Sequence, residues 1–479
     1  MKKGIMFYIG LLLLAVFGFA LVMLVVLYFS PGTEILGFKF YKYSETNVCE
    51  VTTDDSETPL EIGESGKYSE IQINAGYAEV KVEKSNAYDK DSVVIVNNAQ
   101  GFVMAKDEVK FGYSVLVEGD VLKVNVTEPN GFLNFSKDIK VIIQIANKEA
   151  NPFASTKFTV KNSSGNITIG GKENSPYSYT FNTGALDLTT DSGSVRITNT
   201  VNYDEDLKTQ TFPSLKLNIG GGNFTANAES VKTEGDLILQ STSGKFNATG
   251  FEANGNIYIK TESGTYDVTS VTTSLLNVEC KNGYFYIDNI NGNVKFPSAD
   301  MNIETPYFKS KMIGGNIQVI AGNNIKLEVD SVFGNADIST TGGSVTIGSG
   351  KNSGILGTAN IKTESGKILA YIKDGNDNIK DFTTDSGEVE IYLLGQVQTS
   401  TVVNSKNGNV KVKFQTGKAY KFYFTYQTKT DEYDMSRVSF VDYPNITLEN
   451  PFVYTEVAEN RGEVEIHTDA NVELSLFTA

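Results

Sequence analysis

The sequence predicts an all-β fold, a single-stranded-stack β-solenoid resembling a parallel β-helix, preceded by one transmembrane helix. A short phrase recurs in which a small polar residue and Gly precede alternating apolar residues, as in Ser164–Ile169 and Ser386–Ile391. The repeat unit spans about 20 residues, which is typical of solenoids and too short for a propeller blade. An uncharged run of 25 residues, Ile5–Phe29, stands ahead of all the copies.

This N-terminal run predicts a membrane anchor. A helix needs about 20 apolar residues to cross a bilayer core, whereas the apolar part of a cleaved signal peptide has only about 7–15. Lys2 and Lys3 precede the run, so the positive-inside rule places the N-terminus in the cytoplasm and the bulk of the chain outside the cell. Because no second run of this length follows, we expect a single-pass protein of the cell membrane.

Composition shifts divide the chain into six predicted segments. They are a cytoplasmic stub (1–4), the transmembrane anchor (5–29), a stalk or linker (30–66), an N-terminal β capping region (67–157), the regular β-solenoid (158–416) and a C-terminal β cap (417–479). Both caps contain alternating strand patterns in which the phrase is irregular, as expected of terminal repeats. The C-terminal cap should protect the last strand edge from pairing with other chains.

Each repeat unit is expected to contain two turns, each followed by a short strand. Gly can adopt positive φ without strain, which suits a sharp turn between strands. The second and fourth residues after Gly should point into the core, as with Phe285 and Ile287, while the first and third face solvent. The structural turn glycines predicted in this way are Gly165, Gly193, Gly244, Gly264, Gly283, Gly343, Gly366, Gly387 and Gly408.

The scarcity of reactive side chains argues against catalysis. The chain has one His and two Cys, so a His-ligated metal site or a Ser-His relay is not expected. The alternation of Leu276–Cys280 places Cys280 on the apolar side of its strand, which favours a buried free thiol over a disulfide with Cys49. We predict no catalytic residue, no cofactor and no metal ligand.

Four acidic residues in equivalent turns are the strongest argument for the enzyme alternative. Asp191, Glu262, Glu364 and Asp385 all precede Ser-Gly, and parallel β-helices include polysaccharide lyases and hydrolases. Glycoside hydrolysis needs two carboxylates about 5–9.5 Å apart. A shared turn position favours local bonds from the acids to turn amides over a unique site, and the calcium-binding G-G-x-G-x-D form is absent.

The charge of the chain bears on its partners. The formal net charge is −16 at pH 7, which disfavours binding to nucleic acid because phosphate contacts need clustered Lys and Arg. Tyr258, Tyr284 and Tyr286 occupy outward positions of neighbouring units. Exposed tyrosines on a flat β face are suited to stack on sugars or on a protein, so these three residues are the predicted binding surface. Lateral packing against a cap or loop is the competing explanation.

These patterns together resemble a known family. The strands within Ile71–Val82, the apolar strand Ile139–Ile145 and repeated units such as Ser243–Phe246 and Ser365–Ile368 resemble the bacterial putative-adhesin β-solenoid family of unknown function, which is related to the toast-rack domains of envelope-stress systems. The resemblance covers roughly residues 66–430. It implies an extracytoplasmic, non-enzymatic role in adhesion or envelope sensing and supplies no catalytic residues.

The sequence therefore predicts a membrane-anchored extracytoplasmic β-solenoid that acts in recognition, adhesion or scaffolding at the cell envelope. The expected partners are the membrane, through residues 5–29, and a cell-envelope glycan or protein. Two alternatives remain open: a polysaccharide-active β-helix enzyme, and an envelope-stress sensing subunit that works through membrane partners.

Overall fold

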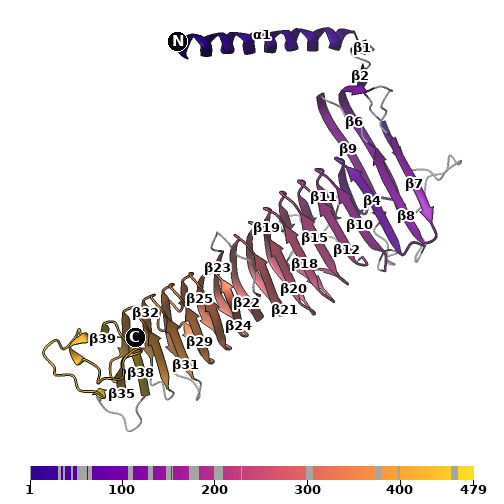
Figure 1. Ribbon diagram of the computed structural model, residues 1–479. Helices are drawn as coiled ribbons and strands as arrows, with labels where there is room; N and C mark the ends of the chain where they lie inside the picture. Colours follow the sequence, from indigo (N-terminus) through magenta and orange to yellow (C-terminus); the bar gives the residue numbers. More distant parts are fainter. Residues whose placement is uncertain are drawn as a thin grey trace.

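The computed structural model describes residues 2–30, 34–35, 38–44, 47–50, 62, 67–105, 112–127, 133–146, 153, 155–171, 183–198, 209–227, 229–297, 306–373, 379–395, 400–454 and 462–478. One helix, α1 (Lys2–Phe29), precedes a long stack of β-strands that runs from the N-terminal to the C-terminal part of the chain (Figure 1). The all-β solenoid with a helix at its start is as predicted.

The strands form three faces that run the length of the stack. Face 1 contains β7 (Gly112–Glu118), β8 (Val121–Thr127), β4 (Glu70–Gly76), β10 (Lys157–Asn162), β12 (Leu186–Thr190), β15 (Leu215–Ile219), β18 (Leu237–Ser241), β20 (Ile257–Thr261), the ends of β21 (Thr265–Cys280) and β22 (Tyr284–Phe296), β24 (Ile317–Asn323), β26 (Ala336–Thr340), β29 (Ala359–Thr363), β31 (Lys380–Thr384), β33 (Thr401–Ser405), β38 (Gly462–Thr468), β35 (Tyr420–Thr425) and β37 (Phe452–Tyr454).

Face 2 contains β1 (Glu34–Ile35), β2 (Phe38–Ser44), β3 (Asn47–Glu50), β6 (Ser92–Ala105), β9 (Leu133–Ala146), β5 (Glu79–Ser85), β11 (Ile167–Gly171), β13 (Val195–Thr198), β16 (Phe224–Asn227), β19 (Lys245–Ala253), the starts of β21 and β22, β23 (Tyr307–Ile313), β25 (Lys326–Val332), β27 (Val345–Ile347), β30 (Ile368–Lys373), β32 (Val389–Leu394), β34 (Val410–Gln415), β39 (Val472–Phe477) and β36 (Val438–Phe440). Face 3 is short: β14 (Gln210–Phe212), β17 (Val231–Thr233), β28 (Gly354–Ile355) and segments of the longer strands. A 3-10 helix, η1, spans Met435–Arg437.

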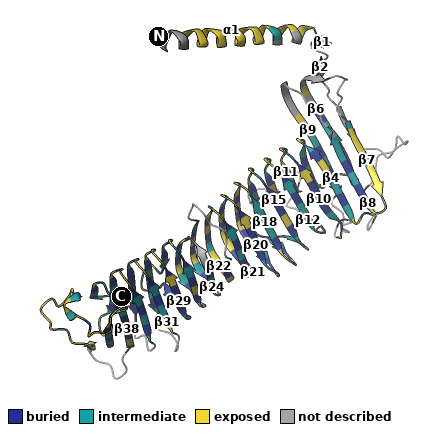
Figure 2. Ribbon diagram, in the orientation of Figure 1, coloured by how far each residue is buried: buried dark blue, intermediate teal, exposed yellow. Residues whose placement is uncertain are grey.

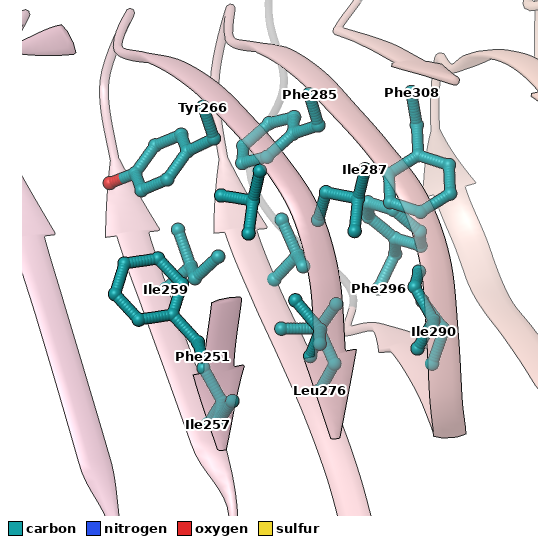
Figure 3. Packing of buried hydrophobic residues seen from close by; sticks show 14 of the residues in the cluster. Phe251, Ile257, Ile259, Tyr266, Leu276, Phe285, Ile287, Ile290, Phe296 and Phe308 are labelled. Carbon is teal, nitrogen blue, oxygen red and sulfur yellow. The ribbon is translucent and has the colours of Figure 1, made fainter. Parts of the chain in front are cut away.

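Parallel, in-register pairing builds the core. We call one complete turn of the solenoid a rung. Each rung places its apolar residues directly above those of the rung before, as with Phe246, Tyr266 and Phe285 on face 2. These three side chains are fully buried, and their rings stack at 4.5 and 5.0 Å between centroids. Figure 3 shows the stacked rings of Tyr266 and Phe285. Burying a side chain of this kind stabilises the fold by about 1.5–3 kcal/mol. Figure 2 shows that buried residues recur along the length of the stack, so each rung adds a contribution of this kind. The predicted inward positions are thus confirmed.

At the turn between faces 1 and 2, glycine is required because the backbones of successive rungs approach each other closely, and not because the turn needs a positive φ. At Gly366 and Gly387 a Cβ would collide with the carbonyl oxygen of the corresponding Gly one rung earlier, and no positive φ is found at either position. Positive φ occurs at other glycines, including Gly292 and Gly348. The expectation that the turn glycines adopt positive φ is therefore wrong, because what the stack requires there is room for the neighbouring backbone.

A buried hydroxyl closes this turn from inside. The Gly387 N–H donates to Thr384 Oγ1 at 2.8 Å, and Gly264 and Gly366 make the same bond to the Thr three residues earlier. The four turn acids, in contrast, are exposed. The prediction that the acids bond the turn amides is therefore wrong for these glycine N–H groups, because the Thr hydroxyl is already in place on the inner side of the turn.

Both ends of the stack depart from the regular repeat. At the N-terminal end β2 and β3, within the predicted stalk, pair antiparallel with β6, which pairs antiparallel with β9. At the C-terminal end the last two strands in sequence, β38 and β39, lie between β33 and β34 on one side and β35 and β36 on the other. The outer edge of β35 is covered by β37 and by the Asn450 side chain, which bonds both the N–H and the C=O of Phe424.

Helix α1 carries the uncharged run of the sequence. Its described side chains are apolar and mostly exposed, for example Leu14 and Phe17. Over the part of the chain that the structure describes, no helix meets the length and hydropathy expected of a membrane-crossing segment.

Candidate binding surface

The structure separates the three tyrosines predicted as one binding surface. Tyr284 and Tyr286 both lie on β22 in face 2, where they are 47% and 39% exposed. Tyr258 lies on β20 in face 1, half-buried, and its hydroxyl accepts a hydrogen bond from Asn256 at 3.1 Å. Tyr258 therefore does not join the other two, and the surface consists of the pair on β22 with its neighbours.

A third tyrosine completes the surface. Tyr307 on β23 lies directly opposite Tyr284 in the register, and its ring contacts both others edge to face, at 6.5 Å from Tyr284 and 5.6 Å from Tyr286. Sequence reasoning missed Tyr307 because no Gly phrase precedes it. The available signal was the triplet Tyr307-Phe308-Lys309, which repeats the aromatic pattern of Tyr284-Phe285-Tyr286. We call Tyr284, Tyr286 and Tyr307 the tyrosine triad.

Polar contacts from the next rung hold Tyr307 in place. Lys326 Nζ lies 4.6 Å from the centre of its ring, and its hydroxyl donates to Glu328 Oε2 at 2.6 Å. Lys326 and Glu328 also form an ion pair at 3.0 Å. Burial and the neighbouring carboxylate raise the pKa of Tyr307. Burial acts to raise the pKa of Glu328, but hydrogen bonds from Tyr307 and Lys326 outweigh it and lower the pKa of that carboxyl. At neutral pH Tyr307 is therefore a phenol and Glu328 a carboxylate.

Charges of both signs flank the triad. Asp267 precedes Tyr286 by one rung and Lys309 follows it by one rung in the same outward column. With Lys326 and Glu328 these make two acidic and two basic groups around three rings. The local charge therefore balances although the whole chain carries −16.

A second aromatic cluster on face 2 shows what a closed arrangement looks like. Tyr371 and Tyr392 stack at 4.1 Å, and Lys413 lies 4.7 Å from the Tyr392 ring while donating to its hydroxyl and to Glu390. Glu390 is 8% exposed, and although burial opposes it, hydrogen bonds from Lys413, Lys367 and Tyr392 lower its pKa to about 2. Both tyrosines are half-buried, so this cluster stabilises the rungs and offers little ring surface to a ligand.

The four turn acids do not gather at one place along the stack. Glu364 and Asp385 lie in adjacent rungs, since Ser386 N donates to Glu364 O, but Asp191 and Glu262 are three rungs apart, or about 14 Å. Among the described residues no three His, Cys, Asp or Glu side chains are grouped as a metal site would require. Glu262 instead pairs with Lys281 at 3.3 Å.

Cys280 occupies the position that Thr takes in other turns. It aligns with Thr261 in the register, its thiol is free, and the residue is 5% exposed. A hydrogen bond with the Gly283 backbone closes the turn. Burial raises the pKa of its thiol to about 12. The prediction of a buried free thiol at Cys280 is confirmed, while the Cys49 side chain lies outside the described residues.

The stacked three-faced solenoid agrees with a family model. The model described as Toastrack DUF4097 matches residues 68–439. The chain belongs to this family. The match runs from the first rung of the stack into the C-terminal cap, so the predicted resemblance to toast-rack domains is confirmed.

Three crystal structures are similar to this family member. They are a putative cell adhesion protein from Clostridium sporogenes (8% identity, 91% of this chain and 100% of that chain, TM-score 0.15), a putative adhesin from Parabacteroides merdae (12%, 77% and 96%, TM-score 0.22) and a putative adhesin from Bacteroides fragilis (10%, 90% and 97%, TM-score 0.17). At these TM-scores the structural likeness adds nothing to the family assignment. No curated protein matches the chain significantly.

Proposed function

We propose that this Toastrack protein is a non-enzymatic recognition or adhesion module of the cell envelope, anchored by residues 5–29, that binds its partner through the tyrosine triad. The observation that carries the proposal is the pair of exposed rings, Tyr284 and Tyr286, on the outer side of face 2. Exposed aromatic groups on a rigid scaffold supply contact area at a low cost in conformational entropy.

The anchoring part of the proposal rests on the sequence. The 25 uncharged residues Ile5–Phe29 exceed what a bilayer core requires, and the described side chains of α1 are largely exposed apolar groups. Fractionation tests it directly. The full chain should stay with membranes after an alkaline carbonate wash, and a variant lacking residues 5–29 should be released; retention of the shortened variant would contradict the anchor.

The recognition part is tested with the full chain reconstituted into liposomes and floated with envelopes from the source cell, with and without calcium. We expect saturable binding that falls in the Tyr284→Ala and Tyr286→Ala variants. Tyr258→Ala is the matched control, because that ring lies on face 1, and it should bind as the unchanged chain does. Equal binding by all four proteins would refute the triad as the binding surface. Absence of any binding would favour the sensing alternative.

A further inference from the structure

The triad combines ring surface, polar groups and rigidity in a small area. Tyr284 and Tyr286 alternate on one strand, so their side chains leave the same face about 7 Å apart. Tyr307 packs perpendicular to both rings, at interplanar angles of 81° and 86°. We propose that the tyrosine triad is the stacking platform of a binding site for a neutral glycan, an inference that rests on the proposed recognition function.

Ring stacking suits a sugar. One face of a pyranose ring presents C–H groups that pack against the electron-rich face of an aromatic ring. Because Tyr307 is held by Lys326 and Glu328, and holds the other two tyrosines in turn, the platform loses little freedom when a ligand binds. The pair on β22 has room for one or two sugar rings. The positions beside Tyr286 in the neighbouring rungs are occupied by Asp267 and Lys309.

Polar groups at the rim match hydroxyls. Asp267 offers a carboxylate that accepts hydrogen bonds, and Lys309 offers an ammonium group that donates them, one rung to either side of Tyr286. A polyhydroxylated ligand can satisfy both at once, since each hydroxyl donates and accepts.

Charge favours a neutral ligand over an acidic one. The four charged groups at the triad balance, while the chain as a whole carries −16 and repels polyanions at long range. Apolar area argues against a protein partner, because a specific protein interface covers roughly 800 Å² on each side and more than half of that area is apolar. Three rings bordered by charged side chains form a much smaller continuous apolar area.

An array of neutral and acidic oligosaccharides tests the inference. The full chain is applied in a zwitterionic detergent without a sugar headgroup, and neutral compounds that bind are then titrated calorimetrically. Tyr284→Ala and Tyr286→Ala should each weaken binding by about 2- to 12-fold, the range expected for an aromatic contact. Tyr286→Phe, which keeps the ring, should bind within about twofold of the unchanged chain, and so should Tyr258→Ala.

The outcomes separate this inference from the proposed function. Neutral binding that follows this pattern supports both. Binding to acidic compounds alone, or to none, overturns the glycan inference. If envelopes still bind in a Tyr284-dependent manner and lose that binding after protease treatment, the recognition function stands with a protein partner. If envelopes do not bind either, both proposals fail. Circular dichroism on each variant shows whether a loss of binding reflects unfolding, and Tyr286→Phe then decides.

Discussion

Replacing Gly387 with Ala tests whether close stacking of turns is what requires glycine. A Cβ at this position would collide with the Gly366 carbonyl oxygen and lie 2.7 Å from the Gly366 carbonyl carbon and 2.9 Å from Thr384 Oγ1. The turn can relieve the collision only by moving away from the rung before it. That movement breaks the bond from Ser386 N to Glu364 O, now 2.9 Å.

The cost follows from these two effects. Overpacking costs about 1–3 kcal/mol, and a lost hydrogen bond costs about 1 kcal/mol. We therefore expect Gly387→Ala to lower the local free energy of opening by about 2–4 kcal/mol. Because rungs contact only their neighbours, the loss should concentrate in β31 and β32.

Hydrogen exchange with mass spectrometry on the full chain in detergent measures this locally. Amides of β31 and β32 should exchange about 30- to 700-fold faster in Gly387→Ala, while those of β12 and β13 should not change. Gly350→Ala is the matched control, since a Cβ at Gly350 has no atom within 4 Å, and it should change exchange little or slow it.

A third variant separates the two explanations for glycine. Asn tolerates positive φ better than Ala does, so Gly387→Asn would recover stability if backbone conformation were the requirement. By the stacking argument Asn is at least as disruptive as Ala, because it carries the same Cβ. Recovery by Asn, or exchange in Gly387→Ala that matches the Gly350→Ala control, would refute the reasoning.

Three further predictions concern the core and the C-terminal cap. Lys380 is 2% exposed, and its ammonium group bonds only the Gly357 carbonyl in the described structure. Burial lowers the pKa of Lys380 to about 8. Lys380→Met should stabilise the chain by about 1–2 kcal/mol at pH 7, because loss of the hydrogen bond to Gly357 offsets part of the gain from removing a buried charge. Between pH 8 and 10.5 the unfolded chain binds more protons at Lys380 than the folded chain does, so the stability of the unchanged chain should rise with pH in this range. The stability advantage of Lys380→Met should therefore shrink, and urea unfolding midpoints measured across this range will show it. A constant advantage would contradict this. Cys280 should resist alkylation at pH 8 until the chain unfolds, as mass spectrometry of the peptide that contains Cys280 will show. Cys280→Thr should change stability by less than about 1.5 kcal/mol, since Thr fills the equivalent place in other turns. Deleting residues 462–479 should expose β35 to rapid hydrogen exchange although β35 precedes the deletion, because β38 pairs with it; protection that persists would show that β35 is held independently.

Local alternation explains why much of the fold could be predicted. Whether Phe285 or Tyr284 points inward depends only on the period of two along one strand, so the core positions and the buried Cys280 followed from the sequence. The same phrase, however, occurs at both corners of a rung. Asn254–Ile259 opens face 1 and Ser263–Val268 opens face 2, which is why Tyr258 could not be separated from the triad by pattern alone.

Relations between rungs could not be predicted, because they depend on the lengths of connecting loops. Tyr307 meets Tyr284 only because 23 residues separate them, whereas 19 separate Tyr284 from Thr265. The reason for Gly387 likewise lies in the rung before it, and the position of β38 between β33 and β35 reverses the order along the chain. These contacts between distant residues leave no periodic signal.

The same division between inner and outer positions bears on how such a module would adhere. Stacking constrains the inward residues and the turns, so a new side chain is tolerated mainly at outward positions. The triad occupies outward positions in only two successive rungs of face 2. A platform of one or two sugar rings binds weakly on its own. Many copies anchored in one membrane would raise the effective concentration of sites along a polymer, so avidity can exceed the single-site affinity by 10²–10⁴ without any further contact. Under the proposed function, adhesion strength should therefore depend more on the surface density of the protein than on the affinity of one triad.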